Sequence, residues 1–546
     1  MHEPEPTYQD AIERLNAKSL QNCLEVCTLF SCIDFVGRGA SPVFSLLNNE
    51  NVRLLGEAVI KSKAAWYKER LIEPRDLPTL LNGANSALED PRLSEQVISG
   101  GERAQMLFQL TRFISRMSYM QIRPQQNAAI ATGQFFAIAE MLPAEHWQEF
   151  PENLRAAAAQ FPAIIAATLG ASLRDLLDTH HTVMEYLARL GRISLERVGV
   201  RPRTVVEQAN LLRQMIEESS PQLDLFRIVP QRLEQAFGRA LSSELEGYAA
   251  VFSRSIREHR RVLEERPYHV GPEGLRLSSL DRFPLVTGES KGVWYVPNMR
   301  ALGRAAPDVL HFALNEGCRE SYERLRGPSL ELYLRRMLNA RAPNLVVIPE
   351  GRWRTAKGEV AGPDLLVIDH REPPCVLAIE VKFRKMLPST RFELLTEDLS
   401  ENYGDLWEAV RKLPEKLTHV FSISGDYAAY ASDLSRAQKY RRWCVGVAGE
   451  APFGFGELSG QQSEFAPEFP LKGFAEPWTV MSVETFERLV EVVVQYDRPL
   501  TDVVADYCKD CQNLELSESR AEMFRSISVD EQQSYAAKCL ARARIG

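Results

Sequence analysis

Three residues of types that can hydrolyse a phosphodiester lie close together in the second half of the chain. Asp364 follows a Gly-Pro turn, and Glu380 and Lys382 stand two residues apart at the end of the apolar run 376–382. Carboxylates are ligands that Mg²⁺ prefers, and a bound divalent cation lowers the pKa of an attacking water and stabilises the charge that develops on phosphate. A neighbouring ammonium can orient that water or help to deprotonate it. These residue types predict metal-dependent phosphodiester hydrolysis.

Regular β-structure would place the three groups together. Side chains alternate between the two faces of a strand, so Glu380 and Lys382 point to one face while Ile379 and Val381 point to the other. Asp364 stands at the head of the preceding apolar run, 365–369, which also reads as a strand. The sequence therefore predicts one carboxylate at a strand start and a carboxylate–ammonium pair on the next strand.

The order of these segments resembles the PD-(D/E)XK nuclease superfamily, which includes restriction-type and phage-defence endonucleases. The resemblance is carried by Gly362-Pro363-Asp364, a strand and turn, and then Ile379-Glu380-Val381-Lys382. It covers residues 317–449, about a quarter of the chain. It implies that Asp364 and Glu380 bind metal, that the backbone carbonyl of Val381 is an additional ligand, and that Lys382 acts on the water.

Many members of this superfamily also place a glutamate on the helix before these strands. Glu331, in the segment 327–333, fits that position, and Glu323 is the alternative. The resemblance thus gives Glu331 a role as a metal ligand or as support for a second ion. A Lys or Gln from the helix after the third strand reaches the site in many members, and the sequence does not choose among Lys412, Lys416 and Gln438.

The composition is that of a folded protein with several domains. The chain has 546 residues, 45% hydrophobic and 25% charged, with a formal net charge of −8, which favours two to four domains. A net negative charge is compatible with a nucleic-acid site, because a local basic face and metal ions offset phosphate charge. Nine cysteines, an odd number scattered over a long chain, argue against a disulfide framework. No signal sequence and no membrane segment is recognised at the sequence level, so we expect a cytoplasmic location.

The pattern along the chain predicts an α+β protein. We expect a large all-α N-terminal region for sensing or oligomerisation (1–265), a linker (266–300), an α/β restriction-endonuclease-like domain with a central mixed sheet flanked by helices (301–450), and a partly helical, acidic C-terminal extension (451–546). Helical spacing predicts helices at 104–117, 127–141, 205–216, 242–263, 314–325, 329–339, 399–420 and 434–442. Apolar runs predict strands at 344–348, 365–369, 376–382 and 444–448, shorter strand-like pieces at 283–286 and 293–296, and a strand followed by a helix at 478–494.

Two other sets of potential ligands do not form a complete site. Cys508 and Cys511 have the spacing of a zinc-binding pair, but a second pair is missing. His181 and Glu185 lie one helical turn apart without a third ligand. No nucleotide-binding glycine loop and no serine-nucleophile motif is present.

We therefore expect an Mg²⁺-dependent endonuclease, with Mn²⁺ as a substitute, that acts on DNA in anti-phage defence or restriction; the sequence does not separate DNA from RNA. A homo-oligomer or a protein of the same defence system is the expected protein partner, and no membrane is involved. Two alternatives remain open. One is a nuclease fold without catalysis that binds DNA or a partner as a scaffold, and the other is a helical interaction protein in which Glu380 and Lys382 form an exposed, structural pair.

Overall fold

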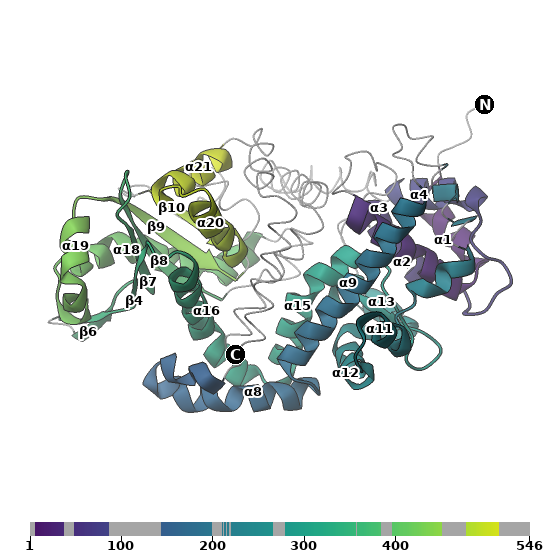
Figure 1. The fold of residues 1–546 in the computed structure, drawn as a ribbon, viewed down its shortest axis with the longest axis horizontal. Helices are drawn as coiled ribbons and strands as arrows, with labels where there is room; N and C mark the ends of the chain where they lie inside the picture. Colours follow the sequence, from purple (N-terminus) through teal and green to yellow (C-terminus); the bar gives the residue numbers. More distant parts are fainter. Residues whose placement is uncertain are drawn as a thin grey trace. The chain divides into compact units, whose positions relative to one another are not determined.

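The computed structural model describes residues 6–37, 49–86, 144–198, 220–265, 279–355, 358–383, 396–449 and 477–512, together with single positions between 210 and 217. The protein is mixed α+β, as predicted. It divides into two compact units (Figure 1): unit 1 comprises residues 1–132, 162–319 and 529–545, and unit 2 comprises residues 133–161, 320–528 and 546. The helices predicted at 104–117 and 127–141 lie outside the described residues.

Unit 1 is mostly helical. Its described helices are α1 (Tyr8–Asn16), α2 (Leu20–Gly37), α3 (Asn49–Lys61), α4 (Leu77–Ser86), the second half of α8 (Arg155–Leu169), α9 (Leu173–Val198), α11 (Pro230–Phe237), α12 (Ser242–Phe252), α13 (Ile256–Glu265), α14 (Ser279–Arg282) and α15 (Met299–Gly317), with the 3₁₀ segments η1 (Pro74–Asp76) and η4 (Ser220–Phe226). A small sheet has the order β1 (Ser253–Ser255), β2 (Leu285–Thr287), β3 (Trp294–Tyr295). The single helix predicted at 242–263 was wrong, because the strand β1 separates α12 from α13 and pairs with β2.

Helix α2 is the centre of unit 1 and packs against α3, α9 and α15. Its buried polar side chains recur every three residues, at Asn22, Glu25, Thr28, Ser31 and Asp34. Most of them hold distant segments of the chain: Asn22 accepts from the Ile72 amide (2.7 Å), Glu25 from Arg227 (2.6 Å), and Ser31 from the Met299 amide. Buried polar groups cost free energy unless they are hydrogen-bonded, so these contacts fix which segments surround α2.

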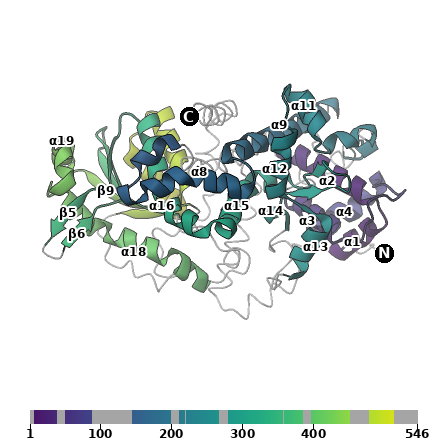
Figure 2. The ribbon, with the colours of Figure 1, turned by 90° about the horizontal axis from the view of Figure 1, so that it is seen from below.

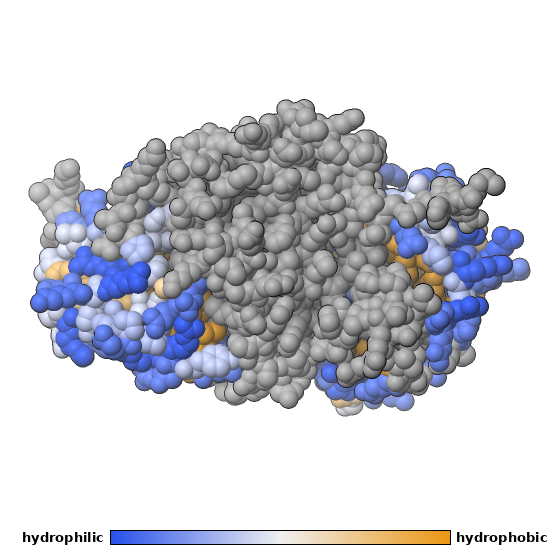
Figure 3. Space-filling model, turned by 90° about the horizontal axis from the view of Figure 1, so that it is seen from above, coloured by the Kyte–Doolittle hydropathy of each residue, from blue (hydrophilic) through white to orange (hydrophobic). Residues whose placement is uncertain are grey.

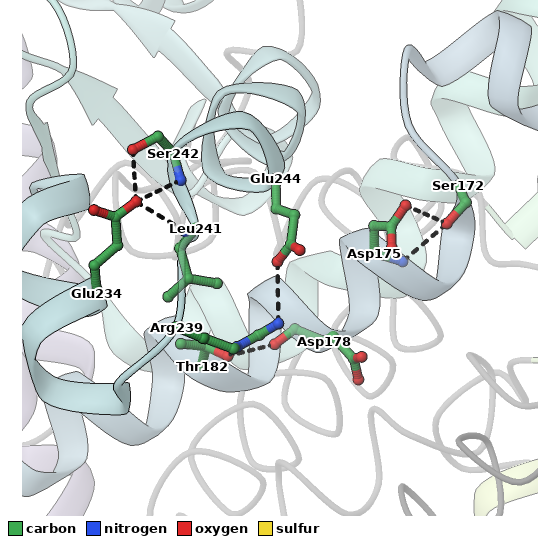
Figure 4. A network of polar contacts seen from close by, with 9 residues as sticks. All are labelled: Ser172, Asp175, Asp178, Thr182, Glu234, Arg239, Leu241, Ser242 and Glu244. Atoms are coloured by element: carbon green, nitrogen blue, oxygen red, sulfur yellow. Dashed lines mark hydrogen bonds and ion pairs between the residues drawn. The ribbon is translucent and has the colours of Figure 1, made fainter.

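A polar junction joins α11 to α12 (Figure 4). Helix α11 ends at Gly238, whose φ of 67° is the left-handed conformation that glycine adopts without strain. The Glu234 carboxylate then accepts hydrogen bonds from the Leu241 amide (2.8 Å) and from the amide and hydroxyl of Ser242 (2.9 and 2.7 Å). These hydrogen bonds lower the pKa of Glu234, and the bond from the Leu241 amide has the largest effect. The carboxylate thereby satisfies amides at the start of α12.

A second part of this network fastens the α11–α12 connection to α9. Arg239 donates to Glu244 of α12 and to the Thr182 hydroxyl of α9, both at 3.2 Å. The N-terminus of α9 is itself capped, because the Asp175 amide donates to the Ser172 hydroxyl (3.1 Å) and that hydroxyl donates to the Asp175 carboxylate (2.6 Å). No role was predicted for Glu234 or Arg239, and in the structure both act as local structural groups.

Unit 2 is built on a five-stranded mixed sheet of order β10–β9–β8–β7–β4. Its elements are the first half of α8, α16 (Arg319–Arg341), β4 (Val346–Pro349), β5 (Arg352–Thr355), β6 (Gly358–Ala361), β7 (Leu365–Asp369), β8 (Cys375–Lys382), α18 (Thr396–Val420), α19 (Ala431–Ala437), β9 (Arg441–Ala448), β10 (Trp478–Ser482), α20 (Val483–Gln495) and α21 (Leu500–Gln512), with the 3₁₀ segments η2 (Ala144–Glu149), η3 (Glu152–Leu154) and η6 (Gly425–Tyr430). Strands β4, β7 and β8 are antiparallel neighbours, whereas β8, β9 and β10 run parallel.

Helix α18 covers one face of this sheet. Val376 and Ala378 of β8 belong to a buried cluster with Leu406, Val410 and Leu413 of α18. Because residues alternate along β8, Glu380 and Lys382 lie on this same face, as predicted. Gly446 pairs with Glu380 on the neighbouring strand, and a Cβ there would approach the Val410 side chain to 2.9 Å. The close approach of α18 to the sheet therefore depends on a glycine beside Glu380.

A two-stranded hairpin, β5–β6, is inserted between β4 and β7 and was not predicted. It lies beside α19 in both ribbon views (Figures 1 and 2), and η6 contacts β5. The strands predicted at 365–369, 376–382 and 444–448 are confirmed as β7, β8 and most of β9, and the segment at 478–494 as β10 and α20. The helix predicted at 434–442 ends earlier, because β9 begins at Arg441.

Pro328 lies inside α16, so the prediction that a helix begins there was wrong. A proline inside a helix costs roughly 3 kcal/mol. Leu325 before it and Leu330 and Leu334 after it are all buried, and burying such side chains stabilises a structure by about 1.5–3 kcal/mol each. Packing on both sides of Pro328 therefore keeps the helix continuous.

The surface drawn in Figure 3 is mostly hydrophilic over the described residues of both units, with apolar colour in small areas. Described large apolar side chains that are exposed are scattered along the chain, at Tyr67, Leu71, Ile193, Val360, Val494 and Tyr496. Within the described part of the chain, no single helix is both long and apolar enough to span a membrane, whereas Glu152–Leu169 and Leu173–Glu196 pass that test as a bent pair. The described cysteines are free thiols, and all but Cys318 are buried.

A buried histidine makes unit 1 sensitive to acid. His259 of α13 is fully buried, with Nδ1 3.1 Å from the Ser279 hydroxyl and Nε2 3.1 Å from the Leu285 carbonyl oxygen, and burial lowers its pKa to about 4. An unfolded histidine takes up a proton near pH 6.5, so the neutral imidazole favours the folded state above that pH. This contribution is lost as the pH falls from about 6.5 to 4, by about 1.4 kcal/mol per pH unit.

We predict that hydrogen–deuterium exchange of α13 amides, corrected for intrinsic rates, accelerates in the wild-type chain as the pH falls from 6.5 to 4.5. His259→Gln, which carries no titrating ring, is expected to be less stable at pH 7 but to show a flatter pH dependence. Equal pH dependence in the two proteins would refute the assignment.

Candidate active site

The predicted site residues meet at one edge of the five-stranded sheet. Asp364 immediately precedes β7, and Glu380 and Lys382 lie at the end of β8. These strands are antiparallel, with Leu365 paired to Ile379. Continuing that register by one residue sets Asp364 opposite Glu380. The sheet thus brings together two carboxylates that are sixteen positions apart in the sequence.

Both carboxylates are held by hydrogen bonds. Asp364 Oδ2 accepts from the Val381 amide at 2.7 Å, so the backbone between Glu380 and Lys382 fixes the Asp364 side chain. Glu380, whose side chain is 3% exposed, accepts at Oε1 from the Lys416 ammonium. A buried carboxylate is strongly disfavoured unless it is paired, and Lys416 supplies that partner.

Among the three candidates on the later helices, the geometry selects Lys416. Its ammonium also donates to the Gly362 carbonyl oxygen at 2.9 Å, so it connects the turn before β7 to the end of β8. Lys412, one helical turn earlier, and Gln438 are exposed. Positions 412 and 416 lie on nearly the same side of α18, one turn apart, so it is the place of Lys416 along the helix axis that brings its ammonium to Gly362 and Glu380.

Glu331 of α16 belongs to the same cluster. Its carboxyl is close enough to Asp364, Glu350 and Glu380 for their negative charges to raise its pKa, while Lys382 lowers it. The alternative, Glu323, is exposed two turns earlier in the helix. The structure therefore brings Glu331 together with Asp364, Glu380 and Lys382 and leaves Glu323 outside.

Glu350 is a site residue that the sequence reasoning missed. It follows β4, and Pro349 pairs with Leu365, so the continued register places Glu350 beside Asp364. Glu350, Asp364 and Glu380 thus form a row across three neighbouring strands. An antiparallel pairing of 344–348 with 365–369, had it been drawn from the sequence, would have pointed to Glu350.

The cluster carries more negative charge than its lysines balance. Burial, followed by the charges of Asp364 and Glu350, raises the pKa of Glu331 to about 8. Burial and Asp364 raise the pKa of Glu380 to about 7, against the opposing effects of Lys416 and Lys382. Partial desolvation of its carboxyl and the charge of Asp364 also raise the pKa of Glu350, although its side chain is exposed overall. Three carboxyls with raised pKa values indicate a site that favours added positive charge.

A bulge at Pro363 sets the position of Asp364. Pro349 pairs with Leu365 and Arg352 pairs with Ala361, so two residues on the outgoing strand face three on the returning strand. The Gly362 amide bonds to the Gly351 carbonyl oxygen at 2.8 Å, which leaves Pro363 as the extra residue. Bulges bend a strand and redirect its side chains, and proline fits there because it has no amide to pair.

The ring of Tyr427, from η6, lies against this bulge and is 1% exposed. Its hydroxyl accepts from the Gly351 amide at 3.1 Å. A Cβ added to Gly362 would lie 1.7 Å from that hydroxyl oxygen, and one added to Gly351 would lie 2.8 Å from the ring carbon that bears it. Both positions therefore require glycine while Tyr427 keeps its place.

Within the described residues, no group of three or more His, Cys, Asp or Glu side chains is arranged to hold a metal ion by itself. In the cluster at the sheet edge, Asp364 Oδ2 and Glu380 Oε1 are engaged by the Val381 amide and Lys416. Elsewhere, His181 pairs with Glu185 at 3.7 Å, and Glu185 also binds Arg189, so this pair acts as a surface ion network. The structure does not describe the side chains of Cys508 and Cys511.

Comparison of the chain with family models, with curated proteins and with solved structures finds no match.

We predict that Gly362→Ala destabilises unit 2 by roughly 1–3 kcal/mol, because the new methyl group overlaps the Tyr427 hydroxyl and the tight bulge must shift. Tyr427→Phe in the same chain is expected to restore part of the loss, since the Cβ would then meet ring carbon at 2.8 Å instead of oxygen at 1.7 Å. The measurement is chemical denaturation of the full chain.

Gly327→Ala is the matched control. Gly327 lies within α16, and a Cβ there meets nothing within 4 Å, so the change should be neutral or stabilising by about 0.5–1 kcal/mol. A Gly362→Ala protein as stable as this control would show that the bulge does not depend on glycine.

Proposed function

We propose that unit 2 is a metal-dependent phosphodiesterase of the PD-(D/E)XK nuclease type that cleaves DNA. The observation that carries the proposal is the convergence of Glu331, Glu350, Asp364 and Glu380 with two lysines at one sheet edge. A merely structural charged pair on a surface hairpin would not need four carboxyl groups in mutual electrostatic range.

The donor chemistry fits a hard divalent cation. Mg²⁺ prefers carboxylate oxygens and keeps several waters, so Asp364 and Glu380 with support from Glu331 would suffice to hold it. The Val381 carbonyl is a further ligand by resemblance. A carboxylate has several acceptor positions, so the existing bonds to Asp364 Oδ2 and Glu380 Oε1 are compatible with ligation through the other oxygen. When bound, the ion activates a water and stabilises charge on the phosphate.

Residues of the chain itself have the remaining roles, which are to hold the two carboxylates and to contact the water and the phosphate. The Val381 amide holds Asp364 in place, and Lys416 holds Glu380. Lys382, at the end of β8 and half-buried, donates hydrogen bonds toward the attacking water and the phosphate oxygens. Lys416, fixed between Gly362 and Glu380, keeps positive charge at the sheet edge where an anionic substrate arrives.

The superfamily resemblance makes DNA the proposed substrate and restriction or anti-phage defence the proposed context. In this proposal, unit 1 senses a trigger, oligomerises or holds the nuclease inactive. The role of unit 1 is argued by analogy with other effectors that combine a nuclease with a large extra domain.

We predict that the full chain cuts plasmid DNA with Mg²⁺ or Mn²⁺ and loses activity with a chelator. Asp364→Asn, Glu380→Gln and Lys382→Met are each expected to lower the cleavage rate by about 10²–10⁴-fold, because the first two weaken the proposed metal ligands and the third removes the ammonium that acts on the water and phosphate. Agarose gels and initial rates on a labelled duplex give the measurement, and labelled RNA tests the other substrate class.

Lys439→Met is the control for Lys382→Met, since Lys439 is exposed after α19. It should leave the rate unchanged. Cleavage by Asp364→Asn and Lys382→Met at the wild-type rate would refute the assignment of these residues to catalysis. Binding of DNA and metal without cleavage would instead favour the scaffold, and binding of neither would favour the helical interaction protein.

A further inference from the structure

The base of the β5–β6 hairpin connects to the site through an unbroken set of contacts. The Gly351 amide donates to the Tyr427 hydroxyl at 3.1 Å, and the Gly362 amide donates to the Gly351 carbonyl oxygen at 2.8 Å. The Gly362 carbonyl oxygen then accepts from Lys416 at 2.9 Å, and Lys416 binds Glu380. Tyr427, which touches none of the site carboxylates in these bonds, is thereby linked to Glu380.

The Lys416 ammonium needs such support. A lysine head is a flexible point charge on a four-carbon stem, and one ion pair leaves it several rotamers. The Gly362 carbonyl supplies a second, directional acceptor. Because Pro363 follows, the amide group that contains this carbonyl has no N–H of its own to pair with a neighbouring strand, so the rest of the bulge must fix its direction.

Several contacts fasten the segment that carries Tyr427. Gly425 has a φ of 61°, and a Cβ there would lie 2.2 Å from the Arg352 carbonyl oxygen. The Asp426 carboxylate accepts from the Arg352 amide at 2.9 Å. The Tyr427 ring also packs against Trp353 of β5, with centroids 6.1 Å apart. The start of η6 is therefore docked on the hairpin base by backbone contacts as well as by packing.

We propose that Tyr427 is a positioning residue for the site: its hydroxyl fixes the Gly351–Gly362 pair at the base of the hairpin, and the Gly362 carbonyl then holds Lys416 against Glu380. This inference rests on the proposed phosphodiesterase function, since positioning matters for a reaction. It goes beyond that function by assigning a role to a buried tyrosine outside the cluster and to the base of the β5–β6 hairpin, which that tyrosine contacts.

The test is a double-mutant cycle in the full chain between Tyr427→Phe and Lys416→Met. Tyr427→Phe keeps the buried ring and removes the hydroxyl; we expect kcat to fall about tenfold, equivalent to about 1.4 kcal/mol, with KM for DNA unchanged. If Tyr427 acts through Lys416, the double variant has the kcat of Lys416→Met alone. The inference would be overturned if the double variant lowered kcat by the product of the two single fold-reductions. It would also be overturned if Tyr427→Phe kept the wild-type kcat.

Tyr440→Phe is the matched control. The Tyr440 hydroxyl is 3.0 Å from His370 Nδ1, and His370 follows the end of β7 remote from Asp364. Tyr440→Phe thus removes one tyrosine hydrogen bond in the same unit. In the Tyr440→Phe, Lys416→Met double variant, the fold-reduction in kcat should equal the product of the two single reductions. The lowering of Tm should equal the sum of the two single lowerings.

Melting temperatures separate this inference from the proposed function. If the wild-type chain cuts no nucleic acid with either metal, the proposed function has failed, yet the cycle can still be read from Tm. A lowering of Tm in the Tyr427→Phe, Lys416→Met double variant smaller than the sum of the single lowerings would support the connection. Additive lowerings would overturn it, whatever the activity.

Discussion

The structure of unit 2 depends on the burial of a carboxylate at the end of its central strand. Glu380 sits among apolar neighbours on β8 and beneath α18, with its side chain 3% exposed. Removing an ion from water costs several kcal/mol unless a partner compensates. That partner comes from α18, so the helix that builds the apolar core also supplies the Lys416 ammonium. The phase of α18, the glycine at 446 and the approach of helix to sheet are all constrained by this one ion pair.

The bulge at Pro363 allows Asp364 to meet two structural requirements at once, one from the strand on each side of it. The ladder between β4 and β7 fixes its place in the row beside Glu350, while its carboxylate must reach the Val381 amide on β8. An extra residue in the returning strand gives the freedom to do both. Glycines at 351 and 362 then let Tyr427 lie against the bulge, so a side chain from the 3₁₀ segment η6 packs on this part of the chain and accepts a hydrogen bond from the Gly351 amide.

The elements predicted well are those whose signal is local. Strands β7 and β8 are short apolar runs between turn residues, and their alternation gave the shared face of Glu380 and Lys382. Pro328 was misread because packing on both sides of it outweighs a local preference. Glu350 and Tyr427 were missed for another reason: neither belongs to a motif, and their place follows from strand register and a bulge, which no local pattern encodes. Choosing Lys416 over Lys412 likewise required the place of each residue along α18 relative to the end of β8, because the two lie on nearly the same side of that helix.

The net charge of the cluster at the sheet edge relates these observations to one another. Glu331, Glu350, Asp364 and Glu380 face the two ammonium groups of Lys382 and Lys416, so two negative charges remain when all six groups are ionised. Burial first, and then the negative charge of the neighbouring carboxylates, raises the pKa values of Glu331, Glu350 and Glu380. Protonation is one way to remove the excess negative charge, and a single divalent cation is another that restores neutrality without a proton. A purely structural network would be expected to reach balance with its own side chains, as Asp369 does by accepting from Arg371 and from the Leu500 amide at the other end of β7. The contrast between these two ends of the same strand is the physical reason for proposing ion binding at the Asp364 end and a structural role at the Asp369 end.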